Sequence, residues 1–113
     1  MAYKEKGNPI VDKSFHFGCD IVLFSRRLKE KGDFEIAHQL LKCGTSIGAN
    51  VRESQRGVST KDFKNKLGIA LKEADEAFYW LDIIEETTMP IPNNLKSKCE
   101  QLIKLLVTII KNS

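Results

Sequence analysis

Two short patterns in the sequence contain residue types that bind metals or catalyse reactions. Glu35 and His38 form a Glu-x-x-His unit, which di-iron carboxylate bundles use twice on facing helices. His16 and Cys19 lie three residues apart, a spacing that places two ligands on one side of a helix. The Glu-x-x-His unit occurs only once, and two ligands without a third and fourth do not hold zinc. The sequence therefore predicts no metal site, no cofactor and no catalytic site.

A stronger chemical signal is the uneven distribution of charge. The net charge is only +3, yet residues 59–72 contain four lysines and one acid, whereas residues 73–86 contain six acids and no base. Arg52 and Arg56 share one flank of the preceding helical segment, and a short junction would place them beside the lysines. The candidate phosphate-binding residues are Arg52, Arg56, Lys61, Lys64 and Lys72.

Two interpretations of this basic surface remain open. An ordered basic patch can neutralise phosphates and bind RNA or DNA through counterion release. A run of charges is also a common feature of a solvated helix face. No motif for reading or stacking bases is visible, so contacts would be to phosphates without sequence preference. The leading hypothesis is a non-enzymatic nucleic-acid-binding module. The alternative is a protein-interaction scaffold or accessory subunit with no direct role in nucleic-acid binding.

The acidic run lies near the end of a predicted helix. Acids at a helix C-terminus oppose the helix dipole, so compensating cations are expected nearby. Arg26 and Arg27 end the first predicted helix, which would run parallel to the third. The sequence therefore predicts that these two arginines offset the acidic run.

Four amphipathic segments must position these charges. Their apolar residues recur at spacings of three and four, which is typical of helices with one buried face. The four predicted helices are about 12–31, 33–56, 59–87 and 93–112. Residues 1–11 are predicted to be an irregular lead-in. Short junctions force consecutive helices to lie antiparallel, so the predicted fold is an all-α, up-down-up-down four-helix bundle in one domain, residues 1–113.

Residues at the segment boundaries have the types that begin and end helices. Asp12 is the predicted N-cap of the first helix, and Ser59 that of the third. Gly32 can end the first helix in a left-handed conformation. Asn93 or Asn94 is expected to cap the fourth helix. These boundary residues support four separate helices.

Gly44 and Gly48 lie on the apolar stripe of the second predicted helix. Each costs roughly 1 kcal/mol in a helix interior relative to alanine. No strand precedes them and no Gly-Lys-Ser/Thr follows, so a phosphate-binding loop is a poor fit. We expect a neighbouring helix to approach the backbone closely at these two positions.

The third and fourth predicted helices carry more apolar residues than one buried face requires. Large apolar patches on a soluble chain usually mark a partner surface, although a thick core is the alternative. We favour self-association as a homo-oligomer. The candidate interface residues are Phe78, Trp80, Ile83, Leu105 and Ile109.

Cys19, Cys43 and Cys99 form an odd set without C-x-x-C spacing. Each is expected to fill core or near-core space in a reducing compartment. The N-terminus lacks the apolar region of a signal peptide. The longest apolar stretch, residues 105–110, is too short to span a bilayer. The chain is therefore expected to be cytoplasmic, without a membrane partner.

The run of residues 39–53, which contains Ser-Ile-x-x-Asn-Val-x-Glu, resembles a known bacterial family, as do residues 59–63 and 70–76. That family is named for proteins encoded in intervening sequences of 23S ribosomal RNA. The resemblance implies a homopentamer and association with RNA or DNA. It also implies, by analogy with the accessory protein of diversity-generating retroelements, a reverse transcriptase or another protein as a partner. It implicates no residue in catalysis.

Ser46, Asn50 and Glu53 match the polar positions of this resemblance. We expect them to act structurally, by satisfying backbone groups near the junction of the second and third helices. Ser54 departs from the pattern, because the family often has glycine directly after the glutamate. The break in the helix is then postponed to Gly57.

Overall fold

The computed structural model describes residues 2–92 and 94–113, and this part of the chain contains four helices and no strand. The predicted all-α fold with four helices is confirmed over these residues. The helices are α1 (Pro9–Glu30), α2 (Phe34–Ser54), α3 (Thr60–Thr87) and α4 (Leu95–Lys111).

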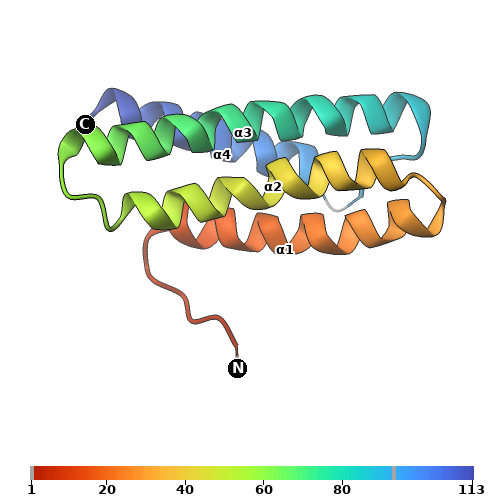
Figure 1. The fold of residues 1–113 in the computed structure, drawn as a ribbon, viewed down its shortest axis with the longest axis horizontal. Coiled ribbons are helices and arrows are strands. Elements are labelled where there is room, and N and C mark those ends of the chain that lie inside the picture. Colours follow the sequence, from red (N-terminus) through yellow and green to blue (C-terminus); the bar gives the residue numbers. More distant parts are fainter. Residues whose placement is uncertain (1, 93) are drawn as a thin grey trace.

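The chain reverses direction at each connection between helices, so that consecutive helices lie side by side (Figure 1). The α1–α2 and α2–α3 contacts are the most extensive, whereas the α1–α4 contact is the sparsest. Helices α1 and α3 are not adjacent in the described part of the chain, although both supply residues to the core. Because the chain reverses direction between α2 and α3, the end of α2 and the start of α3 lie at the same end of the molecule (Figure 1).

One hydrophobic core runs between the helices, and the predicted stripes supply it. The buried set includes Phe17, Ile21, Phe24 and Leu28 of α1, with matching residues from the other three helices. Packing of such faces accounts for most of the stability of helices in a small protein. Among the described helices, none combines the length and apolarity that crossing a bilayer requires.

Helix α1 begins at Pro9, within the stretch predicted to be irregular. Proline suits the first helical position, because the N–H that it lacks would have no partner there. Asn8, not Asp12, is the N-cap residue. Asp12 instead lies in the first turn, where its carboxylate is free to accept hydrogen bonds from the preceding residues. The predicted role of Asp12 as a cap was therefore wrong.

The other boundaries agree with the predictions to within two residues. Gly32 has a left-handed φ of +89°, and the Ser59 side chain accepts a hydrogen bond from the Asp62 N–H at 3.1 Å. Helix α2 ends at Ser54, two residues before the predicted end.

Helix α4 begins at Leu95, after Asn94 with φ +56°. The Asn94 side chain makes no capping hydrogen bond. Asn93, the other predicted cap, lies outside the described residues.

Gly44 and Gly48 do mark a close approach between α1 and α2. A Cβ added at Gly44 would lie 2.8 Å from Ile21 Cγ2, and one at Gly48 would lie 3.2 Å from the Ser14 carbonyl oxygen. The expectation of close helix packing at these glycines is confirmed. Helix α1 is thereby held tightly against the middle of α2.

The three cysteines lie in different environments. Cys43 and Cys99 are buried, and burial raises the pKa of each thiol to about 12. Cys19 is exposed, so the prediction that it fills core space was wrong. Cys19 is therefore the accessible thiol of the described chain.

Candidate nucleic-acid interface

Four of the five candidate cations lie where α2 ends and α3 begins. Arg52 is in the last turn of α2, Arg56 is in the connection, and Lys61 and Lys64 are near the start of α3. All four side chains are exposed. We call this group the basic end. Lys72, the fifth candidate, is also exposed but lies about three turns further along α3.

The cations of the basic end have no ion-pair partner among the described residues. Glu53, the acid next to Arg52 in the sequence, is bound instead by Lys66 at 2.8 Å, which ties α2 to α3. Exposed pairs of this kind contribute little stability, but this one neutralises the carboxylate beside the arginines. The positive charge of the basic end therefore remains available to a ligand.

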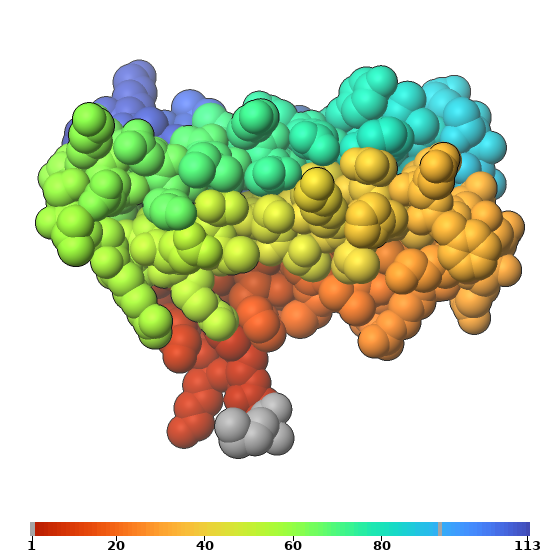
Figure 2. Space-filling model, in the orientation of Figure 1, coloured from red at the N-terminus to blue at the C-terminus, as the bar shows by residue number. Residues whose placement is uncertain are grey.

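A segment before α1 brings further charge to this end. Residues 2–8, which we call the arm, leave the start of α1 and project from the body of the helices (Figures 1 and 2). Asp12 holds the arm, because its carboxylate accepts hydrogen bonds from the Tyr3 hydroxyl at 2.7 Å, the Lys6 N–H at 2.8 Å and the Gly7 N–H at 3.1 Å.

Three further contacts fix the arm. The Tyr3 ring stacks on Phe15, with ring centroids 3.8 Å apart. Glu5 contacts His16 at 2.7 Å. The amide of Asn8 donates to the Gln55 side chain at 3.3 Å, which links the arm to the end of α2. These contacts hold the arm against both α1 and the end of α2.

The hydrogen bonds of Asp12 shift the titration of the groups involved. Partial burial works against the charged carboxylate, but the hydrogen bonds from Lys6 and Tyr3 outweigh it and hold the pKa of Asp12 below its ordinary value of 3.8. Partial burial and the bond to Asp12 raise the pKa of Tyr3 to about 12. At neutral pH the Tyr3 hydroxyl therefore donates to an ionised carboxylate.

The arm and the end of α2 enclose a hollow of about 820 Å³, which we call the arm pocket. Four of its nine lining residues are basic, and none is acidic. Lys4 and Lys6 were not among the predicted phosphate-binding residues, because residues 1–11 were expected to be irregular. Their Lys-x-Lys spacing was the available signal. The lining residues are Ala2, Tyr3, Lys4, Lys6, Asn8, Val11, Arg52, Gln55 and Arg56.

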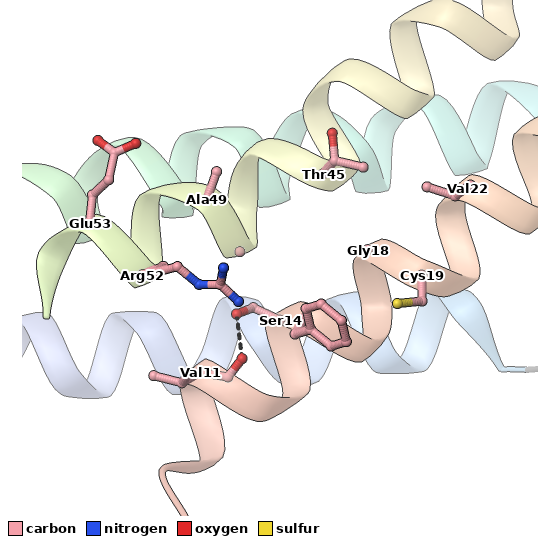
Figure 3. Close-up of a pocket in the computed structure, with 11 residues that line it drawn as sticks. Val11, Ser14, Gly18, Cys19, Val22, Thr45, Ala49, Arg52 and Glu53 are labelled. Carbon is pink, nitrogen blue, oxygen red and sulfur yellow. Dashed lines mark hydrogen bonds between the residues drawn. The ribbon is translucent and has the colours of Figure 1, made fainter. Parts of the chain in front are cut away.

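A second hollow of about 440 Å³ lies beside the arm pocket, between α1 and α2. It shares Val11 and Arg52 with the arm pocket and is lined mainly by small or apolar residues such as Gly18 and Ala49. Figure 3 shows the Arg52 side chain extending from α2 toward α1. Arg52 thus stands at the boundary between an apolar and a basic surface.

Ser46, Asn50 and Glu53 all make structural contacts. The Ser46 hydroxyl donates to the Lys42 carbonyl at 2.6 Å, and the Asn50 amide donates to the Ser46 carbonyl at 2.8 Å. Glu53 forms the ion pair with Lys66. Ser46 and Asn50 bond to backbone groups as expected, whereas Glu53 pairs with a side chain instead.

The five candidate interface residues are half-buried. All except Ile83 pack against the core, as the thick-core interpretation requires. The most exposed large apolar side chains of α1, α3 and α4 are Leu23, Tyr79 and Val107 respectively, which are 58%, 59% and 47% exposed. Sequence periodicity could not separate these outward-facing residues from their half-buried neighbours.

The patterns that suggested metal chemistry do not assemble a site. Glu35 and His38 line an open hollow with Trp80, and His16 contacts Glu5. No group of three or more histidine, cysteine or acidic residues that could hold a metal ion occurs within residues 2–92 and 94–113.

Two acids of the acidic run of α3 pair with a different residue from the two arginines that the sequence predicted. Lys96 of α4 contacts Asp82 at 2.7 Å and Glu85 at 2.9 Å. Arg27 lies over the Phe24 ring instead, 5.9 Å from its centroid. The prediction failed because the adjacent helices of α1 are α2 and α4, not α3.

Fold and surface together define a small all-α protein of four helices with a concentrated basic end. The chain matches the 23S rRNA-intervening sequence protein family over residues 6–108 and belongs to that family. A crystal structure from Bacteroides thetaiotaomicron, described as a protein of unknown function from the S23 ribosomal protein family, is 41% identical in sequence. The match covers 90% of this chain and 98% of that one, with a TM-score of 0.85. Among curated proteins, no sequence matches the chain.

Proposed function

We propose that this protein is a non-enzymatic module, an up-down-up-down bundle assembled as a homo-oligomer, that binds the phosphates of RNA or DNA. The carrying observation is the basic end, where the arginines of α2 and the lysines of α3 are exposed and lack intramolecular ion-pair partners among the described residues. Binding through phosphates needs only ordered positive charge and no base-reading element.

The placement of the lysines on α3 supports this proposal. Lys61 lies in the first turn of α3, where a cation opposes the helix dipole at a cost of roughly 0.3–1 kcal/mol. No described acid pairs with it to offset that cost. Contact with an anionic ligand would explain why a destabilising lysine occupies this exposed position.

Oligomerisation would strengthen such binding, because each added copy contributes another basic end to one particle. The exposed apolar residues Leu23, Tyr79 and Val107 support self-association. The expected assembly is a homopentamer, so light scattering should give a mass five times the 12.8 kDa of the chain. A monomeric mass at micromolar concentration would contradict this part of the proposal.

The binding test uses a labelled RNA hairpin and a DNA duplex over a salt series. We expect the logarithm of affinity to fall linearly with the logarithm of salt, with a slope of about −0.9 for each duplex phosphate neutralised. The double variant Arg52→Glu/Arg56→Glu should bind about 100-fold more weakly, or worse, at roughly 0.1 M salt.

The matched control is Arg26→Glu/Arg27→Glu, which changes the net charge equally at the other end of α1. Both arginines are exposed, so folding should be kept in both variants and is checked by circular dichroism. Equal losses in the two double variants would show that only total charge matters. No binding by the unaltered protein would exclude the function.

A further inference from the structure

The arm pocket has the size and composition of a ligand site. Its volume of about 820 Å³ lies in the range of roughly 300–1,000 Å³ that is usual for ligand pockets, so it is too large to serve a single small ion. Lys4 and Lys6 come from the arm, and Arg52 and Arg56 come from α2. The pocket therefore presents cations from two walls to anything that lies between them.

The acids nearest to this pocket are already engaged. Asp12 faces the arm backbone and the Tyr3 hydroxyl, and Glu5 contacts His16. Neither acid lines the pocket. Neither acid forms an ion pair with the four cations of the pocket, so these cations can interact with a polyanion that enters it.

We propose that the arm pocket grips consecutive phosphates of a nucleic-acid strand between the arm lysines and the α2 arginines. This inference rests on the nucleic-acid-binding function proposed above and assigns it a specific site. The planar guanidinium groups of the arginines suit bidentate contacts with phosphate oxygens. Lysine supplies a compact charge from the opposite wall.

Asp12 acts in this site as a positioning residue. It touches no phosphate, but its three hydrogen bonds hold Lys4 and Lys6 in place opposite α2. A wall that is fixed before binding loses less conformational entropy on binding than a frayed terminus would. The arm therefore increases the affinity for phosphates through its fixed conformation as well as through its charge.

The first test compares two double variants of equal charge. Lys4→Gln/Lys6→Gln should weaken duplex binding about ten-fold at roughly 0.1 M salt and reduce the salt slope by about one per lysine. The control, Lys29→Gln/Lys31→Gln, removes two exposed lysines at the other end of α1 and should leave the slope unchanged. Equal behaviour of the two variants would overturn the inference.

The second test separates position from charge. Asp12→Ala removes a negative charge, so electrostatics alone predicts tighter binding, whereas loss of the held arm predicts weaker binding. Asp20→Ala is the control, since it also removes one acid from α1 but breaks only an ion pair with Lys98. We expect weaker binding for Asp12→Ala alone. Tighter binding for both variants would overturn the role of the arm.

The outcomes distinguish this inference from the broader function. If the unaltered protein binds the duplex, and the Arg52→Glu/Arg56→Glu variant loses binding while the arm variants do not, the function stands and the arm pocket is excluded. If the unaltered protein binds no nucleic acid, both fail. In a competition experiment, poly-L-glutamate is added at the same total charge as the duplex. If it displaces the duplex, the ligand class of the pocket is an acidic peptide, and the inference is overturned.

Discussion

The two ends of α3 carry opposite charges, and the protein treats them differently. At the acidic end, Lys96 of α4 contacts both Asp82 and Glu85 and lies 5.6 Å over the Phe78 ring. These contacts, first of all the hydrogen bonds to the two carboxylates, raise the pKa of Lys96 above its ordinary value. Two of the six acids of this run are thus paired within the chain.

At the basic end, the corresponding compensation is absent from the described residues. Lys61 and Lys64 have no acidic partner there, and the single ion pair, Lys66 with Glu53, removes an acid from the vicinity of the arginines. Both charge runs oppose the helix dipole. Lys96 of α4 pairs with two acids of the acidic run, whereas Lys61 and Lys64 of the basic run pair with no acid among the described residues. The lesson is that a charge run indicates a binding surface only when the fold leaves it unpaired.

Packing between the two ends should affect stability more than charge at either end does. In Gly44→Ala, the added methyl group would lie 2.8 Å from Ile21, which is fully buried and not free to move. Overpacking costs about 1–3 kcal/mol, and the gain in helix propensity returns about 1. We expect a net loss of up to about 2 kcal/mol in the free energy of unfolding, measured by urea denaturation at a fixed protein concentration.

Gly68→Ala is the matched control, because Gly68 lies in α3 and a Cβ there would meet nothing within 4 Å. This variant should gain about 0.5–1 kcal/mol. If the two alanine variants were equally stable, the close α1–α2 contact would not limit stability.

The fold was predictable because its main signal is local. Apolar spacing fixed the buried faces of all four helices, and residues such as Gly32 and Ser59 marked the boundaries. The start of α1 was missed because Pro9 breaks a helix interior but suits a first turn. Asp12 was assigned a local capping role, whereas its real partners precede it by five to nine residues.

The site was only partly predictable, since it depends on which helices touch. The sequence indicated Arg52 and Arg56, but nothing in it showed that the arm folds against them to form a pocket. Compensation of the acidic run by Lys96 rather than Arg27 likewise follows from the helix neighbours. Such pairings between distant residues are set by tertiary packing, which periodicity does not encode.

Neutralising one lysine at each end of α3 should change stability in opposite directions. Lys96→Met keeps an apolar stem over Phe78 but leaves two acids unpaired, so we expect a small loss in the free energy of unfolding. Lys61→Met removes a cation from a helix N-terminus and should gain a few tenths, roughly 0.3 kcal/mol. Both shifts are measured as changes in urea midpoint.

Added salt provides the control for this pair of variants. At about 1 M salt, the interaction between exposed charges is screened beyond about 3 Å. The stability changes caused by Lys96→Met and Lys61→Met should therefore both become smaller. A loss of stability in Lys61→Met similar to that in Lys96→Met would show that the basic end is compensated in the same way as the acidic end, and the contrast between the two ends would be lost.

Lowering the pH should release the arm from the basic end and change the stability of the four helices little. The pKa of Asp12 is lower in the folded chain than its ordinary value of 3.8. The stabilisation that Asp12 gives to the arm is therefore fully present above about pH 3.8 and is lost as the pH falls through the lower, folded value. The amide resonances of Lys6 and Gly7, which donate to this carboxylate, should report the release in a pH titration by NMR.

In the Asp12→Asn variant, the same resonances should show no transition over this acidic range, because an amide side chain does not titrate there. Tyr3→Phe removes one of the three hydrogen bonds and should move the midpoint up toward the ordinary value, since that bond favours the charged carboxylate. A midpoint above the ordinary value in the unaltered protein would mean that burial outweighs the hydrogen bonds. The arm would then be held by the stacking of Tyr3 on Phe15 rather than by Asp12.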